Sequence, residues 1–343
     1  MPFARSVGIF LQAALCLGML AGSLSAQETV SLVGSGSNLA GSLYSAWTSQ
    51  YEKAHPGVGV RYVALGTSQS LHEISQGTGD FGGGEIPLKD SQRHAGKFTL
   101  VQFPTVLVAI APIYKLPGKP DLRFSGELLA GIFLGNIKNW NDPRIAKLNP
   151  GVTFPDLPIT VVHLSGVKGS SYILTDFLSK TSPEWKTKIG KSGSPNWPVG
   201  LEVGRSDGMA TKVSETPGAI GYVELAYVQR KDIGYGSVLN AAGHFVKPTR
   251  ETILAACQEA EKSMQDDLGV SLAYAAGKDS YPMVSFTWIY VPASGLPAAR
   301  SRALKEFWNW ALVDGREVAS QLGYTELPPN VAAKAREVLN SVQ

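Results

Sequence analysis

TVSLVGSGSNLAGSLYSAWTSQYEKAHPGVGVRYVALGTSQS, residues 29–70, contains one pattern twice: a strand, a small polar loop and a helix. The first strand ends in the loop 34–38, and the second, at 58–64, ends in the loop 66–70. Between them, four apolar side chains recur at every fourth position, the spacing of one helical face: Leu39, Leu43, Trp47 and Tyr51. This alternation predicts an α/β fold with parallel strands.

Two more loops of small residues, 82–85 and 165–171, extend the pattern along the chain. The second of them follows a strand predicted at 159–164 and precedes another helical segment. Apolar runs predict further strands at 106–111, 219–225 and 283–291. No tandem repeat or low-complexity tract interrupts them.

These four loops have the composition of an anion site. Glycines let backbone N–H groups approach a ligand, and a helix start adds free N–H donors and a favourable dipole. Ser and Thr hydroxyls add donors without adding charge. Each loop taken singly is also typical of an ordinary helix cap. Four of them in one chain favour binding of a compact oxyanion.

The composition excludes several classes of protein. The chain has 343 residues, 44% of them hydrophobic and 17% charged, with a formal net charge of +3. This apolar fraction excludes a disordered or fibrous chain, and the length predicts about two domains. The small net charge excludes an extended nucleic-acid interface, so we expect no nucleic-acid partner. Two cysteines exclude a disulfide scaffold and a Cys-based zinc ribbon.

Residues 1–26 have the features of a secretory signal peptide. Arg5 precedes the apolar run 7–20, and small residues follow it up to Ala26. Cleavage after Ser25 or after Ala26 fits, and an uncleaved anchor is the alternative, although the run is shorter than the roughly 20 residues of a comfortable membrane span. We therefore expect an exported protein, located in the periplasm. Cys257, the cysteine that remains, is predicted to be a buried structural thiol.

No arrangement typical of catalysis is present. The five histidines lack the His-Glu-x-x-His spacing, and no Gly-x-Ser-x-Gly elbow occurs. Gly34-x-Gly36 lacks the third glycine of the dinucleotide fingerprint, and Gly190-Lys191-Ser192 lacks the first glycine of a P-loop. We therefore predict a binding protein with no catalytic residue, no metal ligand and no cofactor.

The chain resembles the periplasmic phosphate-binding proteins of ABC phosphate importers (the PstS type). The segments that carry the resemblance are Asp80-Phe81-Gly82, Phe103-Pro104-Thr105, 135–143, 145–151, 197–200 and 217–224. The resemblance implies the type II periplasmic binding fold, with two lobes of mixed sheets flanked by helices and linked by a hinge. It divides the chain into a first lobe from 27–104 and 285–343 and a second lobe from 105–284. The hinge strands would cross near 103–106 and 283–286.

The resemblance also implies a function. A protein of this family captures inorganic phosphate between its lobes and delivers it to the membrane permease of an ABC importer. We expect a monomeric, non-catalytic receptor. Two alternatives stay open: a receptor for another oxyanion or a phosphoester, and an exported phosphohydrolase or adhesin on the same scaffold.

The family's ligand residues are only partly matched. In the first loop, the family has a Thr hydroxyl and backbone N–H groups, and this chain has Asn38 and Leu39 at those positions. In the second loop, Thr67 stands where the family has a Ser. Glu85 replaces an Asp that accepts a hydrogen bond from protonated phosphate. In the fourth loop, the places of an Arg, its partner Asp and a Ser-Gly-Thr run are taken by these residues: Leu164, Gly166, Lys168, Gly169 and Ser170.

These departures bear on ligand selectivity. A carboxylate facing the ligand favours hydrogen phosphate over unprotonated sulfate, because two acceptors would otherwise meet. Glu85 keeps this preference for hydrogen phosphate if the loop accommodates its longer side chain. Lys168 would restore one positive charge in place of the family's Arg. The alternative is that Glu85 and Lys168 are solvated loop charges. For Asp207, capping of the helix after it is favoured over a supporting role behind the ligand residues. Affinity, oxyanion selectivity, the cleavage position, the permease and a regulatory role are left open.

Overall fold

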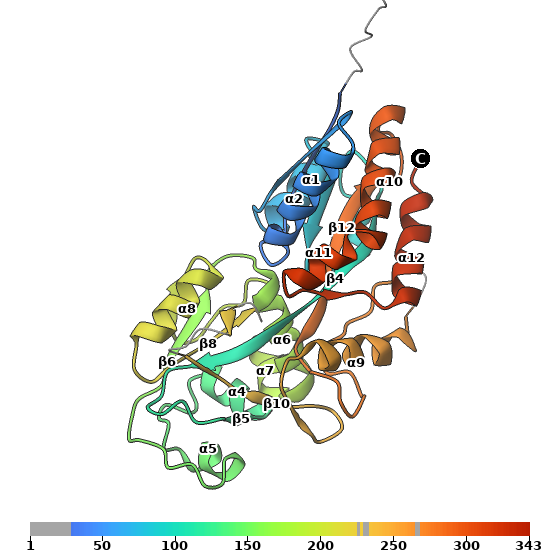
Figure 1. Cartoon of the computed structure of the whole chain (residues 1–343). Coiled ribbons are helices and arrows are strands. Elements are labelled where there is room, and N and C mark those ends of the chain that lie inside the picture. The colour runs from blue at the N-terminus through green and yellow to red at the C-terminus, as the bar shows by residue number, and fades with distance from the viewer. Residues whose placement is uncertain (1–28, 225–226, 229–232, 265–267) are drawn as a thin grey trace, which may run out of the picture.

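The computed structural model describes residues 29–224, 227–228, 233–264 and 268–343. The predicted signal peptide, 1–26, lies outside these ranges. Figure 1 shows two groups of helices and strands, one above the other, joined by long strands. None of the helices within the described ranges combines the length and apolar character that a membrane crossing requires.

The first group begins with the strand–loop–helix pattern of residues 29–70. Its elements are β1 (Val30–Ser35), α1 (Gly41–Ala54), β2 (Val58–Val63), α2 (Thr67–Gln76), β3 (Phe81–Gly84) and α3 (Asp90–Arg93). β1 lies between β2 and β3 and is parallel to both. The sequence pattern therefore predicted β1, β2 and their parallel direction correctly. It was wrong for 82–85, which was expected to be a loop, because Gly82–Gly84 belong to β3.

Two long antiparallel strands connect the groups: β4 (Leu100–Tyr114) and β12 (Val284–Pro292). β12 also pairs with β3, so it lies between β3 and β4 in the sheet. The far half of β4 pairs with β8 (Ala219–Glu224) in the second group. The sheet is therefore mixed, and the purely parallel pattern predicted from residues 29–70 holds only at its two ends.

The second group contains parallel strands and the helices that cover them. β6 (Thr160–Leu164) lies between β8 and β7 (Leu201–Val203) and is parallel to both. Its helices are α4 (Gly126–Phe133), α5 (Pro143–Leu148), α6 (Gly169–Thr181), α7 (Pro183–Lys188) and α8 (Ser206–Glu215). A small sheet and an added strand complete it: β5 (Arg123–Phe124), β10 (Ser237–Leu239) and β11 (Phe245–Val246), with β9 (Gly234–Tyr235) on β4.

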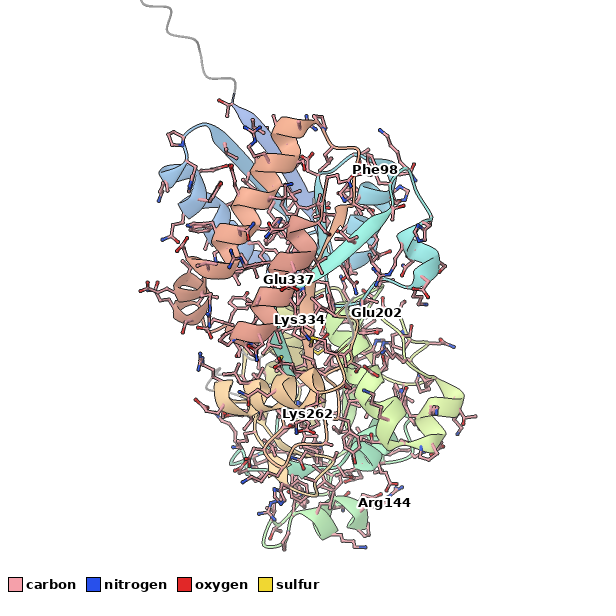
Figure 2. The ribbon with its side chains drawn as sticks, turned by 90° about the vertical axis from the view of Figure 1, so that its right-hand side faces the viewer. Phe98, Arg144, Glu202, Lys262, Lys334 and Glu337 are labelled. Carbon is pink, nitrogen blue, oxygen red and sulfur yellow. The ribbon has the colours of Figure 1, made fainter. Side chains whose placement is uncertain are left out.

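The C-terminal elements return to the first group, as the red helices of Figure 1 show. They are α10 (Ala298–Val313), α11 (Arg316–Gln321), β13 (Thr325–Glu326) and α12 (Pro329–Asn340). β13 pairs with β4, so the chain end reaches the connection between the groups. Figure 2 shows Lys334 and Glu337 on the outer face of α12. α9 (Arg250–Glu261) packs on β4 and β13 and buries Cys257 fully, as predicted.

Aromatic side chains form the core of the first group. Trp47 of α1 and Trp308 of α10 are 1% and 0% exposed and meet edge to face, with ring centroids 6.3 Å apart. Tyr44 stacks on Trp47 on the same helix face. Aromatic pairs of this kind add stabilisation beyond the apolar area they bury. This packing fixes the direction in which the loop after β1 enters α1.

Candidate functional site

A cavity of about 150 Å³ lies where the two groups meet. All seven residues predicted to bind the ligand contribute to its lining: Asn38, Leu39, Thr67, Glu85, Lys168, Gly169 and Ser170. The first four come from the first group and the last three from the second. The structure therefore brings together loops that are separated by up to about 130 positions in the chain.

Helix starts direct N–H donors at this cavity. Thr67 is the first residue of α2, and Gly169 and Ser170 are the first two residues of α6. The first N–H groups of a helix have no partner within the helix, and its dipole favours negative charge there. The hydroxyls of Thr67 and Ser170 are buried, and neither one makes a hydrogen bond within the described part of the chain. These helix starts thus offer donors without a protein acceptor.

Glu85 follows β3 directly and is 1% exposed. Its Oε1 accepts a hydrogen bond from the hydroxyl of Ser37 and another, of 3.4 Å, from Thr287 of β12. Burial raises the pKa of its carboxyl to about 7; the Ser37 bond opposes this rise, and the charge of Glu224 adds to it. Glu85 is therefore a buried acceptor that readily holds a proton.

Gly169 allows Glu85 to reach the start of α6. A Cβ on Gly169 would lie 2.8 Å from the Cβ of Glu85 and would overlap its carboxyl group. Only glycine therefore permits this contact between a side chain of the first group and a helix start of the second. The contact places a carboxyl acceptor among the donors of α6.

The remaining predicted residues differ in exposure. Asn38 is exposed, and Leu39 is half-buried, with its carbonyl oxygen accepting a hydrogen bond of 2.8 Å from the hydroxyl of Tyr324. Lys168 is half-buried and directly precedes α6; its N–H donates to Gly193 O at 2.9 Å. Within the described residues, its ammonium group makes no ion pair. Lys168 can therefore serve a negatively charged ligand.

Comparison with known proteins identifies the family. A model of the PBP superfamily domain matches residues 22–314. The chain is 36% identical over 313 residues to the phosphate-binding protein PstS of Xylella fastidiosa, covering 90% of this chain and 85% of that one. It is also 36% identical to the phosphate-binding protein PstS of Pasteurella multocida, covering 90% and 89%. The chain belongs to the PstS family.

A solved structure supports the fold of this PstS family member. An ABC-type phosphate transport receptor from Vibrio cholerae superposes with a TM-score of 0.61 at 17% identity, covering 87% of this chain and all of that one. At this identity the likeness concerns the fold, which is the mixed two-group α/β arrangement predicted from the resemblance.

Sequence reasoning missed part of the PstS-family cavity. The start of α8 adds Arg205 and Ser206, next to Asp207, for which the sequence already offered a supporting role. The end of β8 adds Glu224, and residues 322–325 close one side. Residues 201–208 show the same pattern as the four predicted loops, because a short strand leads into a helix that starts with small polar residues. Residues 322–325 carry no comparable signal.

Glu224 makes the cavity more acidic than predicted. Its Oε1 accepts a hydrogen bond of 2.7 Å from Ser206, while its Oε2 is buried and has no hydrogen-bond partner among the described residues. Burial raises the pKa of this carboxyl above its usual value. Two carboxyl groups with raised pKa values therefore face one small cavity.

Asp207, which was expected to cap the helix after it, is not the N-cap of α8, because Arg205 holds that position. It is the second residue of the helix, and its Oδ1 accepts from Gly208 N at 2.9 Å and from Arg205 Nε at 3.3 Å. Leu164 is buried and also lines the cavity, whereas Gly166 does not. Within the described ranges, no group of three or more His, Cys, Asp or Glu side chains could hold a metal ion.

Proposed function

We propose that this chain is an extracytoplasmic substrate-binding protein that captures inorganic phosphate and delivers it to the membrane permease of an ABC importer. The first lobe would consist of 27–104 and 285–343, the second of 105–284, and the ligand would lie in the cavity between them. The predicted signal peptide would direct the chain to the periplasm. The receptor would act as a monomer.

The observation that carries this proposal is the position of the Glu85 carboxyl. It is a buried acceptor beside helix starts and hydroxyls that are donors. Hydrogen phosphate matches the donors and the acceptor, because it presents acceptor oxygens to the donors and one O–H group to Glu85. Sulfate has no proton, so above about pH 7, where Glu85 is charged, it would leave two acceptors facing each other.

The proposal treats the chain as a receptor and not as an enzyme. Hydrolysis of a phosphoester needs an activated nucleophile with a general base, or a metal that activates water. The described lining residues include hydroxyls and carboxyls but no histidine or cysteine. Names of relatives such as the phosphate-binding protein PstS of Xylella fastidiosa agree with a receptor.

Calorimetric titration with phosphate, arsenate and sulfate tests the proposal. We expect phosphate to bind far more tightly than sulfate. Glu85→Gln should reduce that preference about tenfold or more, since an unmatched buried acceptor costs about 1–3 kcal/mol. Glu337→Gln, on the outer face of α12 (Figure 2), is the control and should leave the preference unchanged. Sulfate binding as tight as phosphate binding would refute the proposal.

A further inference from the structure

Arg205 lies beside the phosphate-site loop of α6, although it belongs to a different strand–helix connection. β6 and β7 are parallel, with Leu164 opposite Val203, and Ser165 N donates to Val203 O at 2.9 Å. The loops that follow these two residues therefore leave the sheet side by side. One ends in Lys168 before α6, and the other ends in Arg205 before α8.

The charges that line the cavity make Arg205 important. Three carboxyl groups contribute to the lining, those of Glu85, Asp207 and Glu224, whereas Lys168 and Arg205 are the described cations there. An anion that enters this cavity meets more negative than positive side chains unless protons are bound. Each cation at the cavity therefore has a large effect on anion binding.

The guanidinium of Arg205 is held at one end and free at the other. Its Nε donates to Asp207 Oδ1 at 3.3 Å, and within the described residues its two Nη groups make no hydrogen bond or ion pair. Its side chain is 79% exposed at the cavity. Asp207 is fixed in turn by the N–H of Gly208. This arrangement leaves two parallel N–H groups available to a ligand.

A second observation points to an oxyanion at the same place. The hydroxyls of Thr67 and Ser170 are buried, line the same cavity and lack an acceptor within the described chain. They and the first N–H groups of α6 need acceptor oxygens. A tetrahedral oxyanion supplies several such oxygens, and those not facing these donors remain for a cation.

We propose that Arg205 is the ligand-binding arginine of this site, with its two Nη groups gripping the oxyanion held at the start of α6 while Asp207 holds Nε. This inference deepens the proposed function and rests on it. A fork of two N–H groups suits two oxygens of one anion better than a single ammonium does. Lys168 then adds a second positive charge but no pair of parallel N–H groups.

The test is calorimetric titration of the full mature chain and its variants with phosphate, arsenate and sulfate. Arg205→Ala should weaken binding of the preferred oxyanion about ten- to a hundredfold, the range of one or two charge-assisted hydrogen bonds. Arg205→Lys should bind the oxyanion with intermediate affinity, because it keeps the positive charge and loses the two Nη groups. The affinity of Arg205→Ala should also depend less steeply on salt.

Arg144→Ala is a matched control. Arg144 also lies at a helix start, as the second residue of α5, and pairs with an aspartate two residues away, Asp142, at 2.7 Å. Figure 2 shows it at the far end of the second group, whereas Glu202 of β7 lies at the level where the groups meet. Arg144→Ala should keep wild-type affinity, and the ligand-free melting temperature of Arg205→Ala should be close to that of wild type, because the Arg205 side chain makes a single, exposed hydrogen bond within the described residues.

The possible results separate the two proposals. If wild type binds phosphate and Arg205→Ala binds it as tightly as Arg144→Ala, the role of Arg205 is refuted and the proposed function stands. If Arg205→Lys binds as tightly as wild type, the two-pronged contact is refuted. If wild type binds none of the oxyanions, the proposed function fails, and this inference fails with it.

Discussion

The carboxyl group of Glu85 is under three influences that can be separated. Burial favours its protonated form most strongly, the hydrogen bond from Ser37 favours the charged form, and Glu224 favours the protonated form again. Glu224 is itself buried enough that its own pKa is raised. A proton on either carboxyl reduces the repulsion between them. Glu85 can therefore change its protonation state near neutral pH.

The raised pKa of Glu85 predicts how stability depends on pH. The unfolded carboxyl releases its proton near its usual pKa of 4.5, whereas the folded one keeps it up to about 7. The free energy of unfolding should therefore fall as pH rises from 4.5 to 7, by up to about 3 kcal/mol from this group. Above pH 7 this contribution should stay constant.

Urea unfolding of ligand-free protein at pH 5 and pH 8 measures the effect. Glu85→Gln does not titrate, so it should lose less stability than wild type between these pH values. Glu337→Gln should lose as much as wild type. Equal losses in wild type and Glu85→Gln would show that the carboxyl has no raised pKa in the folded chain.

Among the elements, β4 and β12 have an irregular pairing where they pass the site. Thr287 pairs with Val106 and Trp288 with Pro104, so Thr105 has no residue opposite it. The Thr105 hydroxyl donates to Thr287 O at 3.1 Å and shares a hydrogen bond of 2.6 Å with the Tyr44 hydroxyl. The bulge thus ties α1 to β12, whose Thr287 also bonds to Glu85.

Thr105→Val should destabilise the protein through this bulge. The change is nearly isosteric and leaves the buried Tyr44 hydroxyl and Thr287 carbonyl without that partner, which costs about 1–3 kcal/mol. Tyr44→Phe should cost less, and the double variant should be little worse than Thr105→Val alone. Urea unfolding of the four proteins gives the coupling. Additive losses would mean that the two hydroxyls do not act together.

The elements also indicate what a sequence can and cannot predict. Local patterns predicted β1, α1, β2 and the small polar helix starts, because spacing and loop composition act over a few residues. The insertion of β12 between β3 and β4 joins residues about 200 positions apart, and no local pattern encodes it. Glu224 was missed for the same reason, since only the pairing of β8 with β4 brings it to the cavity.

At the scale of the whole molecule, the site exists only where the two groups meet. The seven residues taken from the resemblance all line the cavity, because the resemblance already contained this long-range arrangement. It did not include Arg205, which lies in a connection outside the four predicted loops. The structure finds Arg205 through the register of β6 and β7. Closure of the proposed lobes would therefore act on donors from both groups at once.

Gly169→Ala tests this dependence on the meeting of the groups. The added methyl would overlap the Glu85 carboxyl and hold the two groups apart, while alanine is otherwise favourable in a helix. We expect phosphate affinity to fall about tenfold or more, as an overpacking cost of about 1–3 kcal/mol implies. We expect phosphate to decrease the radius of gyration of wild type, measured by small-angle X-ray scattering, and expect Gly169→Ala to lose this decrease. Gly208→Ala, in the first turn of α8 with open space around it, should keep both the affinity and the decrease. Wild-type closure in Gly169→Ala would mean that Glu85 and α6 need not meet when the ligand binds.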